Sequence, residues 1–142
     1  MYFECSLKYW ADDMDSPVIG KRKQFVDVIA CCAENYTDAE AIATQWGLDN
    51  IEEDFRITPI KEINVSGIYY RGDKTGKWFK MSCEYYTETK EGAAKTNKIS
   101  FLVQAKDQKE AYDRTRVILE EEGFTASEVK KNEETKIIEY VV

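Results

Sequence analysis

The amino-acid sequence predicts an α+β fold: two tandem β-β-α-β-β repeats that share one core, with the helices packed on a largely antiparallel sheet. The first observation is a repeated segment, because YFECSLKYW at residues 2–10 returns as WFKMSCEYY at residues 78–86. The second is the order of patterns, since in each half one helical stretch stands between two pairs of strands. The third is size, because a repeat of about 70 residues has little core of its own.

The opening strand of each half alternates between apolar and polar side chains. In the first half, Phe3, Cys5 and Leu7 face one side of the predicted strand, and Glu4 and Ser6 face the other. The equivalent apolar row in the second half consists of Phe79, Met81, Cys83 and Tyr85. This alternation is typical of a sheet with one face on the core.

Three further strands are predicted in each half, one before the helix and two after it. The strand before the helix lies at residues 25–33 in the first half and at 98–105 in the second. The strands after the helix are predicted at residues 55–65, 67–70, 125–132 and 136–141. Pro59 lies in the first of these, and because proline cannot donate to a strand ladder, we expect an edge or a bend there.

Each half also carries one helix with recognisable ends. In the first helix, Thr37 and Glu40 have the spacing of a capping box, and Gly47 is the expected end. In the second helix, Asp107 is the expected N-cap and Gly123 the expected end. The resulting boundaries are residues 1–70 for the first repeat and 78–142 for the second, with RGDKTGK at 71–77 as a linker inside one integrated domain.

Composition and charge disfavour several classes of function. The 142 residues include 27 acidic and 20 basic side chains, a net charge of −7, so a phosphate backbone is repelled on average. The chain has no histidine, which removes the commonest general base and metal ligand. No signal-like start and no apolar run long enough for a membrane span occur, so we expect a cytoplasmic protein with no membrane association.

The four cysteines give no pattern typical of a site. Cys31 and Cys32 are adjacent, which suits neither a disulfide nor the usual zinc-ligand spacing. We expect the cysteines to be reduced and to serve as small buried apolar side chains. No role for the adjacent pair follows from the sequence.

Large rings on the polar face of the two opening strands are the best candidates for binding. If this face is open, the rings can stack bases, a nucleotide or a peptide; if a helix or a second subunit covers it, they are structural. The candidate binding face consists of Tyr2, Lys8, Trp10, Trp78, Lys80 and Tyr86.

Runs of carboxylates form a second candidate surface. They lie at residues 12–15, 52–54 and 120–122. One interpretation is a negative patch that meets a basic partner; the other is metal-dependent hydrolysis by paired acids, which no spacing supports. We expect no catalytic residue, no cofactor and no metal ligand.

The segments YFECSLKY, WFKMSCEY and FLVQAKDQKEA together resemble an uncharacterised family of short proteins. Its members occur in anaerobic gut bacteria, their mobile elements and their tailed phages, and form a domain of unknown function. The resemblance spans most of the chain. It implies a phage or mobile-element setting, hence the host-cell cytoplasm, and it implies no catalytic residue.

The sequence therefore predicts a non-enzymatic protein-interaction or accessory module. The expected partner is another protein with a basic surface, and a homodimer is a further alternative. The second hypothesis is a small-ligand, nucleotide or single-stranded nucleic-acid binder that uses the outward rings, with Lys21, Arg22 and Lys23 supplying charge. Nucleic acid is the less favoured partner because of the net charge.

Overall fold

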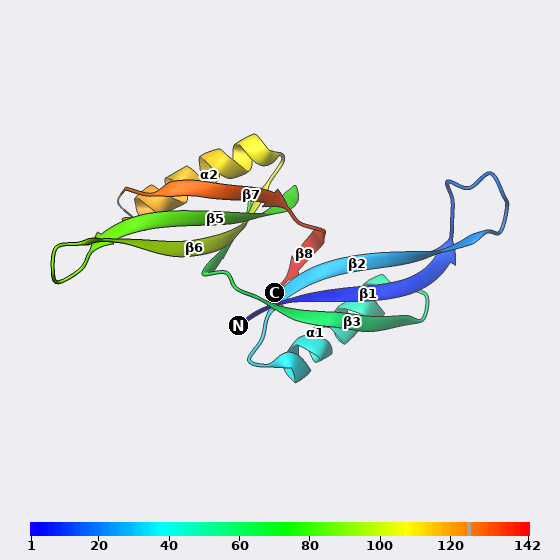
Figure 1. Ribbon diagram of the computed structural model, residues 1–142. Helices are drawn as coiled ribbons and strands as arrows, with labels where there is room; N and C mark the ends of the chain where they lie inside the picture. The colour runs from blue at the N-terminus through cyan, green and yellow to red at the C-terminus, as the bar shows by residue number, and fades with distance from the viewer. Residues whose placement is uncertain (125) are drawn as a thin grey trace. The chain divides into compact units, whose positions relative to one another are not determined.

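The described residues form the α+β fold that the sequence predicts, and they contain two helices and two four-stranded mixed sheets in place of the one largely antiparallel sheet that was expected. Figure 1 shows the computed structural model, which describes residues 1–124 and 126–142. In chain order the elements are β1 (Tyr2–Asp12), β2 (Arg22–Cys32), α1 (Tyr36–Asn50), β3 (Phe55–Ile63), β4 (Gly67–Tyr69), β5 (Lys77–Glu88), β6 (Ala94–Ala105), α2 (Gln108–Glu121), β7 (Glu128–Glu134) and β8 (Ile137–Val141).

The chain divides into two compact units that do not coincide with the sequence repeats. Unit 1 contains Met1–Ile63 and Ile137–Val142, and unit 2 contains Asn64–Lys136. The sheet of unit 1 has the strand order β3-β1-β2-β8, and that of unit 2 has the order β4-β6-β5-β7. The last strand of each repeat thus joins the sheet of the other half, where β8 pairs parallel with β2 and β4 pairs parallel with β6. The segment 71–77 lies inside unit 2, where residues 70–76 connect β4 to β5 and Lys77 begins β5.

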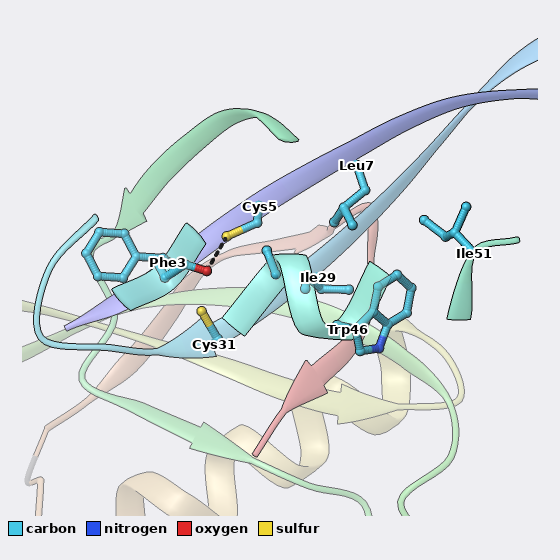
Figure 2. Packing of buried hydrophobic residues seen from close by; sticks show 9 residues of the cluster. Phe3, Cys5, Leu7, Ile29, Cys31, Trp46 and Ile51 are labelled. Carbon is cyan, nitrogen blue, oxygen red and sulfur yellow. Dashed lines mark hydrogen bonds between the residues drawn. The ribbon is translucent and has the colours of Figure 1, made fainter. Parts of the chain in front are cut away.

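The core of unit 1 lies between α1 and one face of its sheet. Figure 2 shows Phe3, Cys5 and Leu7 of β1 pointing toward the same side as Ile29 and Cys31 of β2, where α1 covers them. These are the apolar positions that strand alternation predicts. At the far end of α1, the indole Nε1 of Trp46 donates to Glu139 Oε2 at 2.9 Å, which ties the helix to β8.

Unit 2 repeats this arrangement with its own apolar cluster. Its members are Phe79, Met81, Cys83, Phe101, Val103, Ala105, Ala111, Ile118 and Leu119. Thr115 is buried among them, and its hydroxyl donates to the carbonyl of Ala111 at 2.7 Å, so this polar group is satisfied. The sequence predicted one shared core; the structure shows two helix–sheet clusters, because each helix covers a face of the sheet in its own unit.

The helix ends agree with the sequence for α2 and differ for α1. Asp107 caps α2 by accepting from the backbone N–H of Glu110 at 2.8 Å, and Gly123, at φ +78°, follows its last turn. In α1 the cap is Asn35, whose side chain accepts from the N–H of Asp38 at 2.9 Å, and not Thr37. An Asn two residues earlier supplies the same acceptor, so the helix starts sooner than predicted.

Gly47 does not end α1, which continues to Asn50. A Cβ at this position would stand 2.3 Å from the Phe55 ring and 2.9 Å from Leu7. The glycine therefore serves close packing of the helix on β1 and β3, and not termination.

The two strands before each helix are longer than predicted, the four strands after the helices are shorter, and the edge assignment is correct. Pro59 lies in β3, an outer strand of its sheet, at an irregularity in the β1–β3 register. The late strand predicted from residue 125 is β7, which starts at Glu128; Thr125 itself lies outside the described residues.

Candidate functional site

A groove between α1 and β3 is one candidate site in unit 1. Its volume is about 820 Å³. Glu40, Thr44 and Leu48 stand four residues apart and so form one stripe along α1. The remaining lining residues come from the turn after the helix and from β3: Ile51, Glu52, Glu53, Asp54, Phe55 and Ile57.

The groove has an apolar floor that local packing holds in place. Ile51 is buried, and its N–H donates to the carbonyl of Gly47 at 2.8 Å, which fixes the turn after α1. Phe55 lies against Gly47, so the missing side chain of the glycine admits the ring. Leu48 is 67% exposed although it is a large apolar residue, and it presents an unpaired apolar surface at the groove.

Carboxylates surround this floor, and among the described residues no basic side chain lines it. The acidic members are Glu40, Glu52, Glu53 and Asp54. Three of them follow the C-terminal end of α1, whose last turn has no basic residue, so they stand near the negative end of the helix dipole. Unit 1 as a whole carries 14 acidic and 6 basic side chains, a net −8, whereas unit 2 carries 13 and 14, a net +1. The acidity of the chain therefore resides in unit 1.

The predicted aromatic face divides between the two units, and in unit 1 it is partly open. Trp10 is 55% exposed near the end of β1, while Tyr2 and Lys8 are half-buried. The Tyr2 ring lies 6.5 Å from that of Tyr140 on β8. The sequence left two alternatives for the outward rings, an open face or a covered one, and the Trp10 ring lies on an open face.

In unit 2 the largest predicted ring is covered. Trp78 is only 1% exposed, because it lies on the buried part of its sheet, where Tyr70 packs edge-to-face against it at 5.6 Å between ring centroids. Lys80 is half-buried, with Leu102 directly opposite on β6, and Tyr86 is exposed. Trp78 therefore cannot stack a ligand in this structure.

Lys8 and Trp10 line a second, smaller groove of about 350 Å³ in unit 1. Arg56 of β3 stands directly opposite Lys8, so two cations share one face of the sheet; like charges in this position repel each other. Within the described residues, neither of these cations takes part in a salt bridge. Gln24, directly opposite Trp10, and the carboxylate of Asp54 also line this groove, so its charge is mixed and carries one more cation than anion.

Sequence reasoning missed Arg56 and Leu48. Arg56 belongs to this face only because β3 pairs with β1 in a register that the sequence does not encode visibly. Leu48 was missed because the helix was expected to end at Gly47. Its signal was the spacing of four residues from Thr44, which continues the stripe on α1.

The four cysteines differ in burial, and contact with Cys5 lowers the pKa of Cys31. Cys31 is buried and its neighbour Cys32 is exposed, as successive strand residues point to opposite faces. Contact with Cys31 and burial raise the pKa of the Cys5 thiol, and burial raises the pKa of Cys83 to about 11. Cys5 and Cys83 are therefore thiols, and not thiolates, at neutral pH.

The segment RGDKTGK is built into unit 2 by hydrogen bonds. Arg71 Nε donates to Glu110 Oε1 at 2.6 Å, and its Nη1 donates to Asp73 Oδ2 at 2.8 Å. The backbone N–H of Thr75 donates to Asp73, which lowers the pKa of that carboxyl. The guanidinium of Arg114 donates to the carbonyls of Gln104 and Tyr70. These charged groups hold the β4–β5 connection.

The described residues contain neither a candidate metal-binding cluster nor a helix that could span a membrane. No group of three or more His, Cys, Asp or Glu side chains that could hold a metal ion occurs in residues 1–124 and 126–142. In that same part of the chain, neither helix is long and apolar enough to cross a membrane.

Comparison with known proteins identifies the family. The family DUF4494, described as a domain of unknown function, matches residues 1–142. The chain belongs to this family. No curated protein and no solved structure matches the chain, so the family brings no assigned residue roles to either groove.

Proposed function

We propose that the protein is a non-enzymatic interaction module whose α1–β3 groove binds a basic, amphipathic segment of another protein. The single observation that carries this proposal is the lining of the groove, which combines an apolar floor with four carboxylates and no basic side chain.

The apolar floor supplies affinity. Burying a leucine side chain such as that of Leu48 contributes about 1.5–3 kcal/mol relative to leaving it exposed. Leu48 lies near Ile51 and Phe55 in the lining, so a partner side chain seated there contacts several apolar residues at once. A groove of about 820 Å³ is of the size that binding sites occupy.

The carboxylates determine that the expected partner segment is positively charged. A basic segment relieves the repulsion among Glu52, Glu53 and Asp54 and opposes the negative end of the α1 dipole. The net −8 of unit 1 extends this preference beyond the groove, and it accelerates association with a cationic partner. Because exposed charges are screened, affinity is expected to fall as salt concentration rises.

The test uses two synthetic amphipathic peptides of equal length, one of Leu and Lys and one of Leu and Glu. The Leu/Lys peptide is expected to bind and the Leu/Glu peptide not to bind, measured by fluorescence anisotropy of labelled peptide. Reversing the rim with E52K/E53K/D54K should weaken the Leu/Lys peptide about tenfold or more, since exposed pairs are worth about 0.2–1 kcal/mol each and reversal adds repulsion.

The chain offers a matched control for this test. Residues 120–122 are three consecutive glutamates at the end of α2, and they do not line the α1–β3 groove. The variant E120K/E121K/E122K makes the same change in net charge and should leave peptide affinity within about twofold of wild type. Equal weakening by both triple variants would show a general charge effect and would refute the groove as the site.

One observation favours a second candidate function, the binding of a nucleotide or of single-stranded nucleic acid. Lys8 and Arg56 share a groove with the exposed Trp10 ring and with Asp54, and among the described residues neither cation takes part in a salt bridge; two cations beside an open ring suit an anion that carries a base. Titration of tryptophan fluorescence with ATP and with an oligothymidylate tests it. Quenching in wild type that is lost in Trp10→Leu would support this function, and an unchanged wild-type signal would reject it.

The setting is proposed from the sequence resemblance. The protein acts in a phage or mobile-element context, in a reducing cytoplasm, where a host protein is a candidate for the basic partner. All four cysteines are free thiols, which is compatible with that compartment.

A further inference from the structure

The β1–β2 hairpin of unit 1 presents an unusual tip. In the connection between the two strands, Met14 is 88% exposed, Val18 is 60% exposed and Ile19 is fully exposed. Lys21, Arg22 and Lys23 follow directly and are all exposed. These three are half of the six basic side chains of unit 1. The tip, residues 14–23, therefore combines exposed apolar side chains with three cations and the single carboxylate of Asp15, a net +2, and Asp12 and Asp13 precede it.

The tip is ordered by its own hydrogen bonds. The N–H of Asp13 donates to the carbonyl of Lys21 at 2.7 Å, and the N–H of Val18 donates to the hydroxyl oxygen of Ser16 at 3.1 Å. Arg22 Nη2 donates to the carbonyl of Trp10 at 2.6 Å. A loop ordered before it binds loses less entropy on docking, so the apolar side chains are presented in a prepared form.

The fold itself does not require an apolar tip. The equivalent hairpin of unit 2, between β5 and β6, is closed by the N–H of Thr89 donating to the carbonyl of Ala93 at 2.8 Å. Its tip reads TKEGA and has no large apolar side chain. The difference between two equivalent hairpins places the exposed apolar residues specifically on the first.

We infer that the hairpin tip of one copy of this chain docks into the α1–β3 groove of a second copy. The match is in both polarity and charge. Val18 and Ile19 are suited to the apolar floor around Leu48, and the three cations are suited to the carboxylates at residues 52–54. Ile19 is fully exposed, so the tip does not occupy the groove of its own chain, and the partner is another molecule.

This inference rests on the proposed function, because it names the occupant of the same groove. It predicts self-association through a contact between two different surfaces, which is a heterologous contact. Sedimentation velocity over a range of protein concentrations should show a mass above that of the monomer. The variant V18D/I19D should weaken this association at least tenfold, because two carboxylates then face an acidic groove.

The control is Lys90→Asp/Ala93→Asp at the tip of the second hairpin, which adds one more negative charge than V18D/I19D does and should still associate as wild type does. Circular dichroism checks that each variant is folded; both tips are exposed, so folding is expected to be retained. If the two tip variants lose association equally, the specific docking is refuted.

Charge exchange gives the decisive measurement. K21E/R22E/K23E alone and E52K/E53K/D54K alone should each fail to associate, because like charges then meet. Their mixture should associate, since each reversed surface finds an opposite one in the other variant. Association of either variant alone at wild-type strength would overturn the inference.

Peptide binding separates this inference from the proposed function. A wild-type chain that stays monomeric at all concentrations, while its groove still binds the Leu/Lys peptide, would overturn the self-docking and leave the proposed function intact. A monomeric chain whose groove binds neither peptide would overturn both.

Discussion

Replacing Gly47 with alanine sets two opposite effects against each other at the floor of the groove. Alanine in a helix interior is favoured over glycine by about 0.8–1.0 kcal/mol. Against this, the new Cβ would stand 2.3 and 2.6 Å from two ring carbons of Phe55 and 2.9 Å from Leu7 Cδ2. Carbon atoms are at their optimal separation at about 3.5–4.0 Å, so the ring must move by about 1 Å or more.

We expect the cost of the steric overlap to exceed the gain in helix propensity. Leu7 is fully buried and cannot give way, and Phe55 can move only toward the groove. Forcing extra atoms into a packed core costs about 1–3 kcal/mol, and with three close contacts we take the upper half of that range. After the helix gain is subtracted, Gly47→Ala should lower the free energy of unfolding by about 1–2 kcal/mol.

Urea unfolding followed by circular dichroism measures this change. Gly72→Ala is the control, because a Cβ there has no atom within 4 Å, and its effect should stay below about 0.5 kcal/mol. In a Phe55→Leu background the two ring carbons are absent, so Gly47→Ala should cost about 1 kcal/mol less than in wild type. A Gly47→Ala protein more stable than wild type, or an equal cost in both backgrounds, would refute the reasoning.

Three further predictions concern thiols, pH and the core of unit 2. At pH 8 a thiol reagent should label one cysteine quickly, Cys32, and Cys32→Ser should abolish this fast phase, since the other three thiols are buried; two or more fast thiols would contradict it. The backbone N–H of Thr75 lowers the pKa of Asp73 in the folded protein. The ionised carboxylate therefore stabilises the folded state above the ordinary carboxyl pKa of about 3.9, and this stabilisation is lost as the pH falls through the lower pKa of the folded state. Wild type should therefore lose more stability than Asp73→Asn on acidification, and equal losses in urea unfolding across this range would argue against it. In α2, Leu119→Ala should destabilise by about 2–5 kcal/mol, while the exposed Val117→Ala should change little; thermal unfolding compares the two, and similar effects would be inconsistent with the buried face.

The sequence predicted correctly those features that depend on residues close together in the chain. Alternation along the opening strands placed Phe3 and Phe79 on the core side, and both are buried. The Asp107 cap was predicted from its spacing to Glu110. The cap of α1 was misplaced because Asn35 and Thr37 are both suitable acceptors, and only the path of the backbone selects between them.

The candidate site was predicted only in part, because its residues meet through pairing of distant strands. Alternation along one strand places Trp10 and Lys8 on the same face, whereas Arg56 joins them through the β1–β3 register. Trp78 has the same alternation as Trp10 and yet is covered. Exposure on a strand face depends on what packs over it, which no local pattern reports.

The sequence by itself determined the α+β class, the internal duplication, the core side of each opening strand and the excess of acidic residues. These depend on composition and on short periodic patterns, which act within a few residues. Only the tertiary structure decided that the last strand of each repeat joins the other sheet, that the negative charge gathers in unit 1, and that carboxylates surround an apolar floor beside α1. Those features arise from contacts between residues far apart in the chain, where many pairings satisfy the same local pattern and packing selects one.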